Sequence, residues 1–150
     1  MAENKQDKSG TKASDWSDEE KAAMKERARE LKADKSKRSK ASDEQAVLDK
    51  IGEMPEAERA IATRLHEMIR DEFSDLHAKT WYGMPAYQLN GNTLVFFQSA
   101  HRFDSRYSTI GFSDTAKLDD GAFWPTSFAL LEMDSKVEPQ IRELINKAIG

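Results

Sequence analysis

The chain contains no cysteine among its 150 residues. Thiol catalysis, disulfide bonds and cysteine-ligated zinc or iron–sulfur clusters are therefore excluded. The sequence also lacks any apolar run long enough to form a membrane-spanning helix. The stretch from Met1 to Ser17 is polar and has no apolar centre of the kind that a signal peptide carries, so we expect a cytoplasmic protein without membrane contact.

The motifs of common enzyme classes are missing as well. There is no phosphate-binding glycine loop, no activated nucleophile and no HExxH or HxxxH spacing among the three histidines, His66, His77 and His101. Asp104 and the pair Asp119-Asp120 fall in predicted loops, where aspartate usually forms turns. We therefore expect a protein that binds rather than catalyses, with no catalytic residue to assign.

Charge is divided unevenly along the chain. Residues 1–42 carry 12 Lys/Arg against 9 Asp/Glu, whereas residues 43–150 carry 11 against 18. The larger part is acidic, which disfavours nucleic acid as a partner. The basic, serine-rich stretch 34–41 has no aromatic side chain on which bases could stack, so it is expected to be a solvated tether.

The N-terminal part is predicted to be separate from the main domain. Residues 1–14 are almost entirely polar and are expected to be disordered. Ser17 and Glu20 form a capping box that begins a helix over 18–33. Its apolar stripe is thin, so we expect a mostly solvated helix that docks or recruits a partner through Trp16 and Met24. The chain is thus divided into 1–41 and a folded domain 42–150.

Three further helices are predicted in the folded domain. A capping box at 42–45 opens a short helix that ends at Gly52. Apolar residues at spacings of three and four from 57 to 76 predict a long helix that packs on a sheet. A capping box from Ser135 to Glu138 opens the closing amphipathic helix. His66 is expected on the solvated side of the long helix, and His77 near its acidic residues.

Between the long and closing helices the pattern is that of strands. Segments 79–82, 86–89, 93–99, 107–112 and 126–133 have strand character, with a break at 83–85 and a short helix or turn expected within 113–121. Asn90-Gly91 is a strong hairpin signal. Helices, then hairpin-linked strands, then a helix predict an α+β fold: a two-layer sandwich with a mainly antiparallel sheet of about five strands packed with helices.

Two binding sites are predicted from the residues. Aromatic side chains from neighbouring strands, with Arg102 and Arg106 on the connection after the hairpin, could hold a small anion or a peptide carboxylate. This groove is assigned to Tyr82, Met84, Arg106 and Trp124, the alternative being that the aromatics form the core. Adjacent Trp81 and Tyr82 would point to opposite faces of a strand unless the break at Gly83 rotates one of them.

The second site is a row of carboxylates. Glu67 and Asp71 lie four residues apart on the predicted long helix, and Asp75 extends the row if the helix continues that far. Carboxylate oxygens suit hard cations such as Fe²⁺, Mn²⁺ and Mg²⁺. A solvated helix face is the alternative explanation for these residues.

The segment from Trp81 to Tyr87, the strand ending in Phe96-Phe97, the pair Gly111-Phe112 and the closing helix resemble the YdhG-like family of bacterial domains. That family is grouped with frataxin-like and YjbR-like proteins, and the resemblance covers about residues 43–150. It implies a two-layer α+β fold and a role as an iron chaperone, in which Fe²⁺ is held transiently and delivered to a protein partner. The resemblance supplies no catalytic residues, and the oligomeric state is left open.

Overall fold

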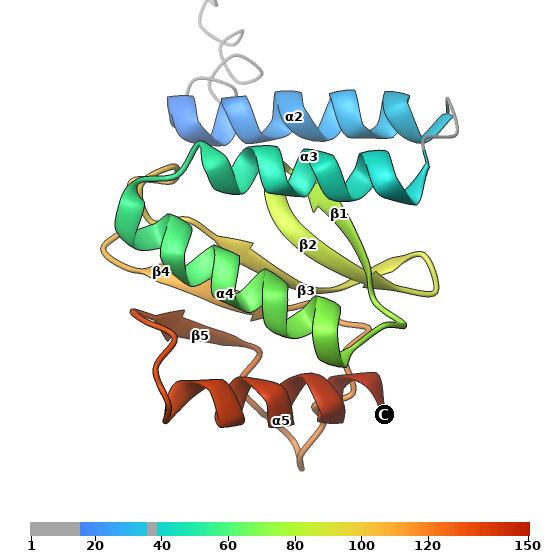
Figure 1. Cartoon of the computed structure of the whole chain (residues 1–150), viewed down its shortest axis with the longest axis vertical. Coiled ribbons are helices and arrows are strands. Elements are labelled where there is room, and N and C mark those ends of the chain that lie inside the picture. Colours follow the sequence, from blue (N-terminus) through green and yellow to red (C-terminus); the bar gives the residue numbers. More distant parts are fainter. Residues whose placement is uncertain (1–15, 36–38) are drawn as a thin grey trace, which may run out of the picture.

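The computed structural model of the protein describes residues 16–35 and 39–150, and the disorder expected for 1–14 lies outside them. Helices precede and follow a run of five strands (Figure 1). The described elements are α2 (Asp18–Lys35), α3 (Lys40–Gly52), α4 (Glu56–Glu72), β1 (His77–Trp81), β2 (Met84–Leu89), β3 (Asn92–Gln98), β4 (Ser108–Phe112), β5 (Ser127–Leu130) and α5 (Val137–Ile149). The predicted α+β class with a five-stranded antiparallel sheet is confirmed.

The sheet is a meander in the order β1-β2-β3-β4-β5, and each strand runs antiparallel to its neighbour. Asn90 and Gly91 form the two-residue turn between β2 and β3, with φ values of 53° and 84°. Two successive positive φ values are what a type I′ turn requires, so the hairpin predicted there is confirmed.

The break predicted at 83–85 is a second hairpin turn of the same kind, but it falls at Tyr82 and Gly83, and Met84 and Pro85 already belong to β2. Tyr82 and Gly83 have φ values of 53° and 76°, and Trp81 pairs directly with Met84 across the turn. The turn takes Tyr82 out of strand geometry, so its ring meets the Trp81 ring edge-on at a centroid distance of 4.9 Å. The opposed orientation expected for consecutive strand residues therefore does not apply to this pair.

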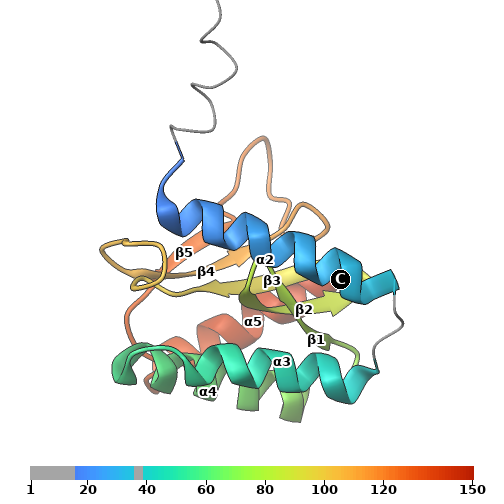
Figure 2. The same ribbon diagram turned by 90° about the horizontal axis from the view of Figure 1, so that it is seen from above.

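The core lies between one face of the sheet and helices α3, α4 and α5 (Figure 2). Helix α4 presents a continuous apolar stripe to this core, which also takes side chains from the three middle strands and α5: Ile61, Leu65, Met68, Ile69, Tyr87, Val95, Phe97, Ile110 and Ile145. Each large apolar side chain buried in this way contributes roughly 1.5–3 kcal/mol. Helix α2 lies on the opposite side of the sheet, near β1 (Figure 2).

A bulge lets β3 bury two consecutive side chains. The pairing of β2 with β3 shifts register after Tyr87, which leaves Leu94 without a directly opposed residue. An extra residue of this kind bends the strand and re-aims its side chain. Leu94 and Val95 are accordingly both buried in the core cluster.

The predicted caps of two helices are wrong by one to three residues. Ser39 caps α3 by accepting a hydrogen bond of 3.1 Å from the Ser42 N–H, so the helix begins before the capping box predicted at Ser42. At α5, which begins at Val137, the side chain that accepts from the first N–H groups, those of Lys136 and Val137, is Asp134 in place of the predicted Ser135. These two hydrogen bonds lower the pKa of Asp134, and the bond from Val137 has the larger effect. In both regions several residues of capping type stand side by side, and the pattern alone does not rank them.

Two other predicted boundaries change. Helix α4 ends at Glu72, so buried Phe73 and Leu76 pack from the turn that follows it. The last strand covers only Ser127–Leu130. Of the short helix or turn expected within 113–121 the structure has the turn, at 114–115, where the Ser113 hydroxyl donates to the Thr93 carbonyl. No helix in the described ranges is both long and apolar enough to cross a membrane.

Candidate functional site: a cavity between two helices and two loops

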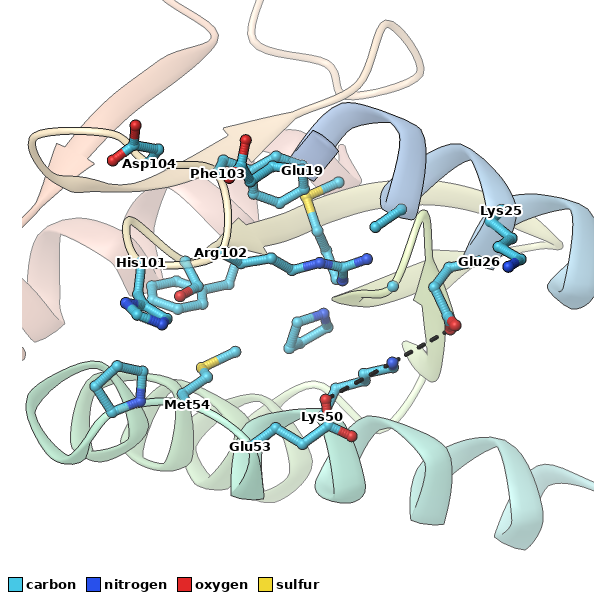
Figure 3. Close-up of a pocket in the computed structure, with 17 residues that line it drawn as sticks. Glu19, Lys25, Glu26, Lys50, Glu53, Met54, His101, Arg102, Phe103 and Asp104 are labelled. Atoms are coloured by element: carbon cyan, nitrogen blue, oxygen red, sulfur yellow. Dashed lines mark ion pairs between the residues drawn. The ribbon is translucent and has the colours of Figure 1, made fainter. Parts of the chain in front are cut away.

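A cavity of about 690 Å³ lies at the end of the sheet where four chain segments meet (Figure 3). Helix α2 forms one wall, and the end of α3 with Met54 and Pro55 forms the wall opposite. The floor is the start of β2 with Phe97 and Ser99, and the loop 101–104 closes one end. This volume is in the range that accommodates small organic ligands.

Arg102 reaches across this cavity from the loop (Figure 3). Its guanidinium lies over Gly83, where an added Cβ would collide with it, and 5.3 Å from the centre of the Phe103 ring. Only glycine provides both the positive φ of this turn and the space for the guanidinium. In the described part of the chain Arg102 has no carboxylate within ion-pair distance, although its side chain is half-buried.

Hydrogen bonds to two side chains hold the loop that carries Arg102. The carboxylate of Glu58, on α4, accepts from the Ser99 hydroxyl and, at 3.1 Å, from the His101 N–H. The Ser108 hydroxyl accepts from the Ala100 N–H at 3.0 Å. These hydrogen bonds hold the backbone of residues 99–101, which come directly before Arg102. They therefore restrict the position of the Arg102 Cα.

Some of the remaining charged groups of the cavity are neutralised, whereas Glu19 and Lys25 of α2 form no ion pair with another described residue. The Lys50 ammonium lies 3.2 Å from Glu26 on α2 and 3.8 Å from Glu53 (Figure 3). Both carboxylates are therefore engaged, and the Lys50–Glu26 pair links the two opposing helices. The Asp104 carboxylate points away from the guanidinium of Arg102 (Figure 3). Among the cations that line this cavity, Arg102 is the one whose side chain reaches across it (Figure 3).

The N–H groups of the β1–β2 turn point at helix α2. Both the Tyr82 N–H and the Gly83 N–H donate to the Glu30 carboxylate at 2.8 Å. Glu30 is only 5% exposed, and the Arg27 guanidinium lies 3.6 Å from it. The pKa of neighbouring Lys79 is lowered, mainly because its ammonium is partly buried and also because the positive charge of Arg27 is near. Glu30 was not predicted as a site residue, because it lies 52 residues before Tyr82 and carries no local signal.

The structure does not bring the four predicted groove residues together at this cavity. Met84 lines it, whereas the Tyr82 ring lies under the Arg27 guanidinium, whose Cζ is 5.6 Å from the ring centre. Arg106 is exposed and lies over its neighbour Tyr107, and Trp124 packs against the core cluster. Arg102, four residues before Arg106, lines the cavity instead.

The predicted row of carboxylates on α4 contains Glu67 and Asp71 but not Asp75. Glu67 and Asp71 are exposed on α4, but the helix ends before Asp75, which lies in the turn beyond it. Glu67 also lies 3.6 Å from the Arg64 guanidinium. Within 16–35 and 39–150 no group of three or more His, Asp or Glu side chains is placed to hold a metal ion. Transient Fe²⁺ binding here stays a prediction.

His66 is buried, not solvated as expected from its place on the helix. Its Nδ1 is 2.8 Å from the Tyr87 hydroxyl and its Nε2 is 2.9 Å from the Glu44 carboxylate. Helix α3 packs beside this part of α4 and covers the side that would otherwise meet water. His77 lies 2.9 Å from Asp43 of α3.

The predicted docking residues of the N-terminal helix are exposed. Trp16 is 42% exposed and Met24 is 43% exposed, whereas Ala23 and Glu30 of the same helix are buried. A role for Trp16 and Met24 in recruiting a partner stays a prediction.

Comparisons of the chain with protein-family models, with curated proteins and with solved structures found no match. The resemblance to the YdhG-like family therefore stays a prediction, as does the iron-delivery role that it implies.

Proposed function

We propose that this protein binds, without transforming it, a small ligand that joins one anionic group to an apolar body. The observation that carries the proposal is the Arg102 guanidinium, which is half-buried in the cavity with no carboxylate partner among the described residues. Arginine presents a planar fork of N–H donors that matches carboxylate and phosphate groups. An electrostatic interaction at such a partly buried site is stronger than it would be in water.

The apolar walls support the second half of the proposal. Met54, Pro55, Met84 and Phe103 line the cavity beside the guanidinium, and fully buried Pro85 and Phe97 form part of its floor. Ligand sites of this size typically combine apolar walls with a few polar groups that set the orientation of the ligand. An inorganic anion alone would gain nothing from these apolar side chains, so the ligand is expected to bind more tightly when its anionic group is attached to an aromatic or aliphatic group.

Matched ligand pairs test both parts. Benzoate and phenyl phosphate are compared with benzyl alcohol and phenol, and with inorganic phosphate, by calorimetry and by thermal shift. We expect saturable binding of at least one aromatic anion, weaker binding of inorganic phosphate and none of the neutral analogues.

The same titration is repeated with two arginine variants. Arg102→Gln should weaken the binding of the aromatic anion by roughly tenfold or more, the scale of a lost charged hydrogen bond. Arg106→Gln is the matched control, because Arg106 is exposed and lies outside the cavity lining. Equal losses in the two variants, or no binding by any aromatic anion, would overturn the proposal.

A further inference from the structure

Helix α2 is held to the rest of the molecule mainly by polar contacts. Of its described apolar side chains only Ala23 is buried, while Met24 and Leu31 are 43% and 48% exposed. The contacts that fasten it are the Glu30 carboxylate on the β1–β2 turn, the Lys50–Glu26 pair and Arg27 over the Tyr82 ring. An element held by so little apolar surface is expected to open locally at a free energy well below that of global unfolding.

Gly83 contacts both α2 and Arg102. The Gly83 N–H donates to Glu30 on one side, and the Gly83 Cα supports the guanidinium of Arg102 on the other. The positive φ values of Tyr82 and Gly83 direct two successive N–H groups to one point, the arrangement that captures a carboxylate. When Glu30 occupies this point, it holds the turn and hence the surface on which Arg102 lies.

Helix α2 is also a wall of the cavity. Glu19, Ala22, Lys25 and Glu26 line it from one side, so departure of α2 would open the cavity along its length. Docking of α2 therefore completes the enclosure of any ligand and at the same time fixes the turn beneath Arg102.

We infer that anion binding at Arg102 and docking of α2 are coupled through the Tyr82–Gly83 turn, with Glu30 as the positioning residue. The inference rests on the proposed function, since it concerns the regulation of that same site. Two states are involved, one with α2 docked and one with α2 released, and the ligand favours the docked state because only that state presents both the wall and the supported guanidinium. Coupling of this kind is reciprocal. The factor by which the ligand raises the docking equilibrium of α2 is the factor by which docking of α2 raises the affinity for the ligand.

Hydrogen exchange on the full chain measures the coupling directly. Exchange of the α2 segment is followed with and without the aromatic anion that binds best, benzoate or phenyl phosphate. In the unmodified protein the ligand should slow exchange in α2, and in Arg102→Gln the slowing should disappear. The exchange of α4, in the core, serves as the internal reference for global stability.

The second arm substitutes the positioning residue. Glu30→Gln, which leaves one acceptor oxygen for two N–H donors, should raise the Kd of the anion roughly fivefold or more, within the usual range of such couplings. Glu30→Ala should raise it further. Glu143→Gln is the matched control, because it removes the same negative charge at an exposed position on α5. It should alter neither Kd nor α2 exchange.

The outcomes separate the two proposals. If the anion binds through Arg102 but leaves α2 exchange unchanged, or binds Glu30→Gln as tightly as the unmodified protein, the coupling is wrong and the proposed function stands. If no aromatic anion binds, both are wrong. Should a Glu30 variant loosen the core as well, the ligand-induced slowing of α2 in the unmodified protein still decides the matter.

Discussion

The guanidinium of Arg64 on α4 forms two parallel hydrogen bonds to the carboxylate of Glu138 on α5, at 2.7 and 2.8 Å. A second such pair joins Arg142 to Glu72 across the same two helices. These pairs lie outside the core, and they orient the closing helix against the long one.

Acid should weaken this link between the helices. The hydrogen bond from Arg64, with the nearby charges of Arg64 and Arg142, lowers the pKa of Glu138 below its ordinary value of 4.5. A lowered carboxylate pKa stabilises the fold above the ordinary value, and that contribution is lost as the pH falls through the lowered pKa. The melting temperature of Glu138→Gln should lie below that of the unmodified protein at neutral pH, and the difference should shrink as the pH falls below 4.5. A difference that is independent of pH would contradict this account.

The Gly83 turn should tolerate a side chain poorly. Gly83→Ala places a Cβ against the Arg102 guanidinium at a residue of positive φ, whereas Gly91→Ala meets only the φ penalty, because no atom lies within 4 Å of its added Cβ. We expect Gly91→Ala to cost about 1–2 kcal/mol of unfolding free energy and Gly83→Ala to cost more. Urea unfolding of the pair gives the difference. Adding Arg102→Ala to Gly83→Ala should recover the excess, and failure to do so would show that the guanidinium does not occupy this space.

The buried hydroxyl of Tyr87 should contribute to stability through His66. Burial raises the pKa of Tyr87, so its hydroxyl remains protonated, and it lies 2.8 Å from His66 Nδ1. Tyr87→Phe leaves the buried imidazole nitrogen without a partner and should cost about 1–3 kcal/mol. Tyr107→Phe is the matched control, since Tyr107 is 37% exposed and its hydroxyl can bond to water. Equal unfolding free energies for the two variants would argue against the His66 contact.

The iron prediction has a direct test on α4. If Fe²⁺ is held by Glu67, Asp71 and Asp75, then millimolar Mn²⁺, its paramagnetic substitute, should broaden the amide signals of α4 and of the turn after it before those of exposed Glu143. Glu67→Gln with Asp71→Asn should abolish the effect. Uniform broadening over the acidic surface, or no change on α4, would leave the row as a solvated helix face, in keeping with its partial neutralisation by Arg64.

The parts of the fold that could be predicted are those with a local cause. Asn90-Gly91 predicted its hairpin because these two residue types accept the positive φ values that the turn needs. The period of three and four along α4 predicted the buried stripe from Ile61 to Ile69 for a similar reason: the helix repeat is a property of the segment itself. The Ser17–Glu20 capping box likewise forms as expected, with reciprocal hydrogen bonds of 3.0 and 3.1 Å.

The candidate site depended on contacts between distant segments. His66 looked solvated on its own helix and is buried because α3 covers it. The choice between Arg102 and Arg106 could not be made from their shared loop, since Gly83, on another hairpin, accommodates only the first.

By itself, then, the sequence determined the excluded chemistries, the α+β class, the elements and their apolar faces, since these follow from composition, periodicity and turn residues within short stretches. Tertiary structure alone decided that Glu30 meets Gly83 and that Arg102 lies in a cavity closed by α2. The reason is physical: a contact between residues more than fifty positions apart depends on how whole elements pack, and no short-range pattern encodes it.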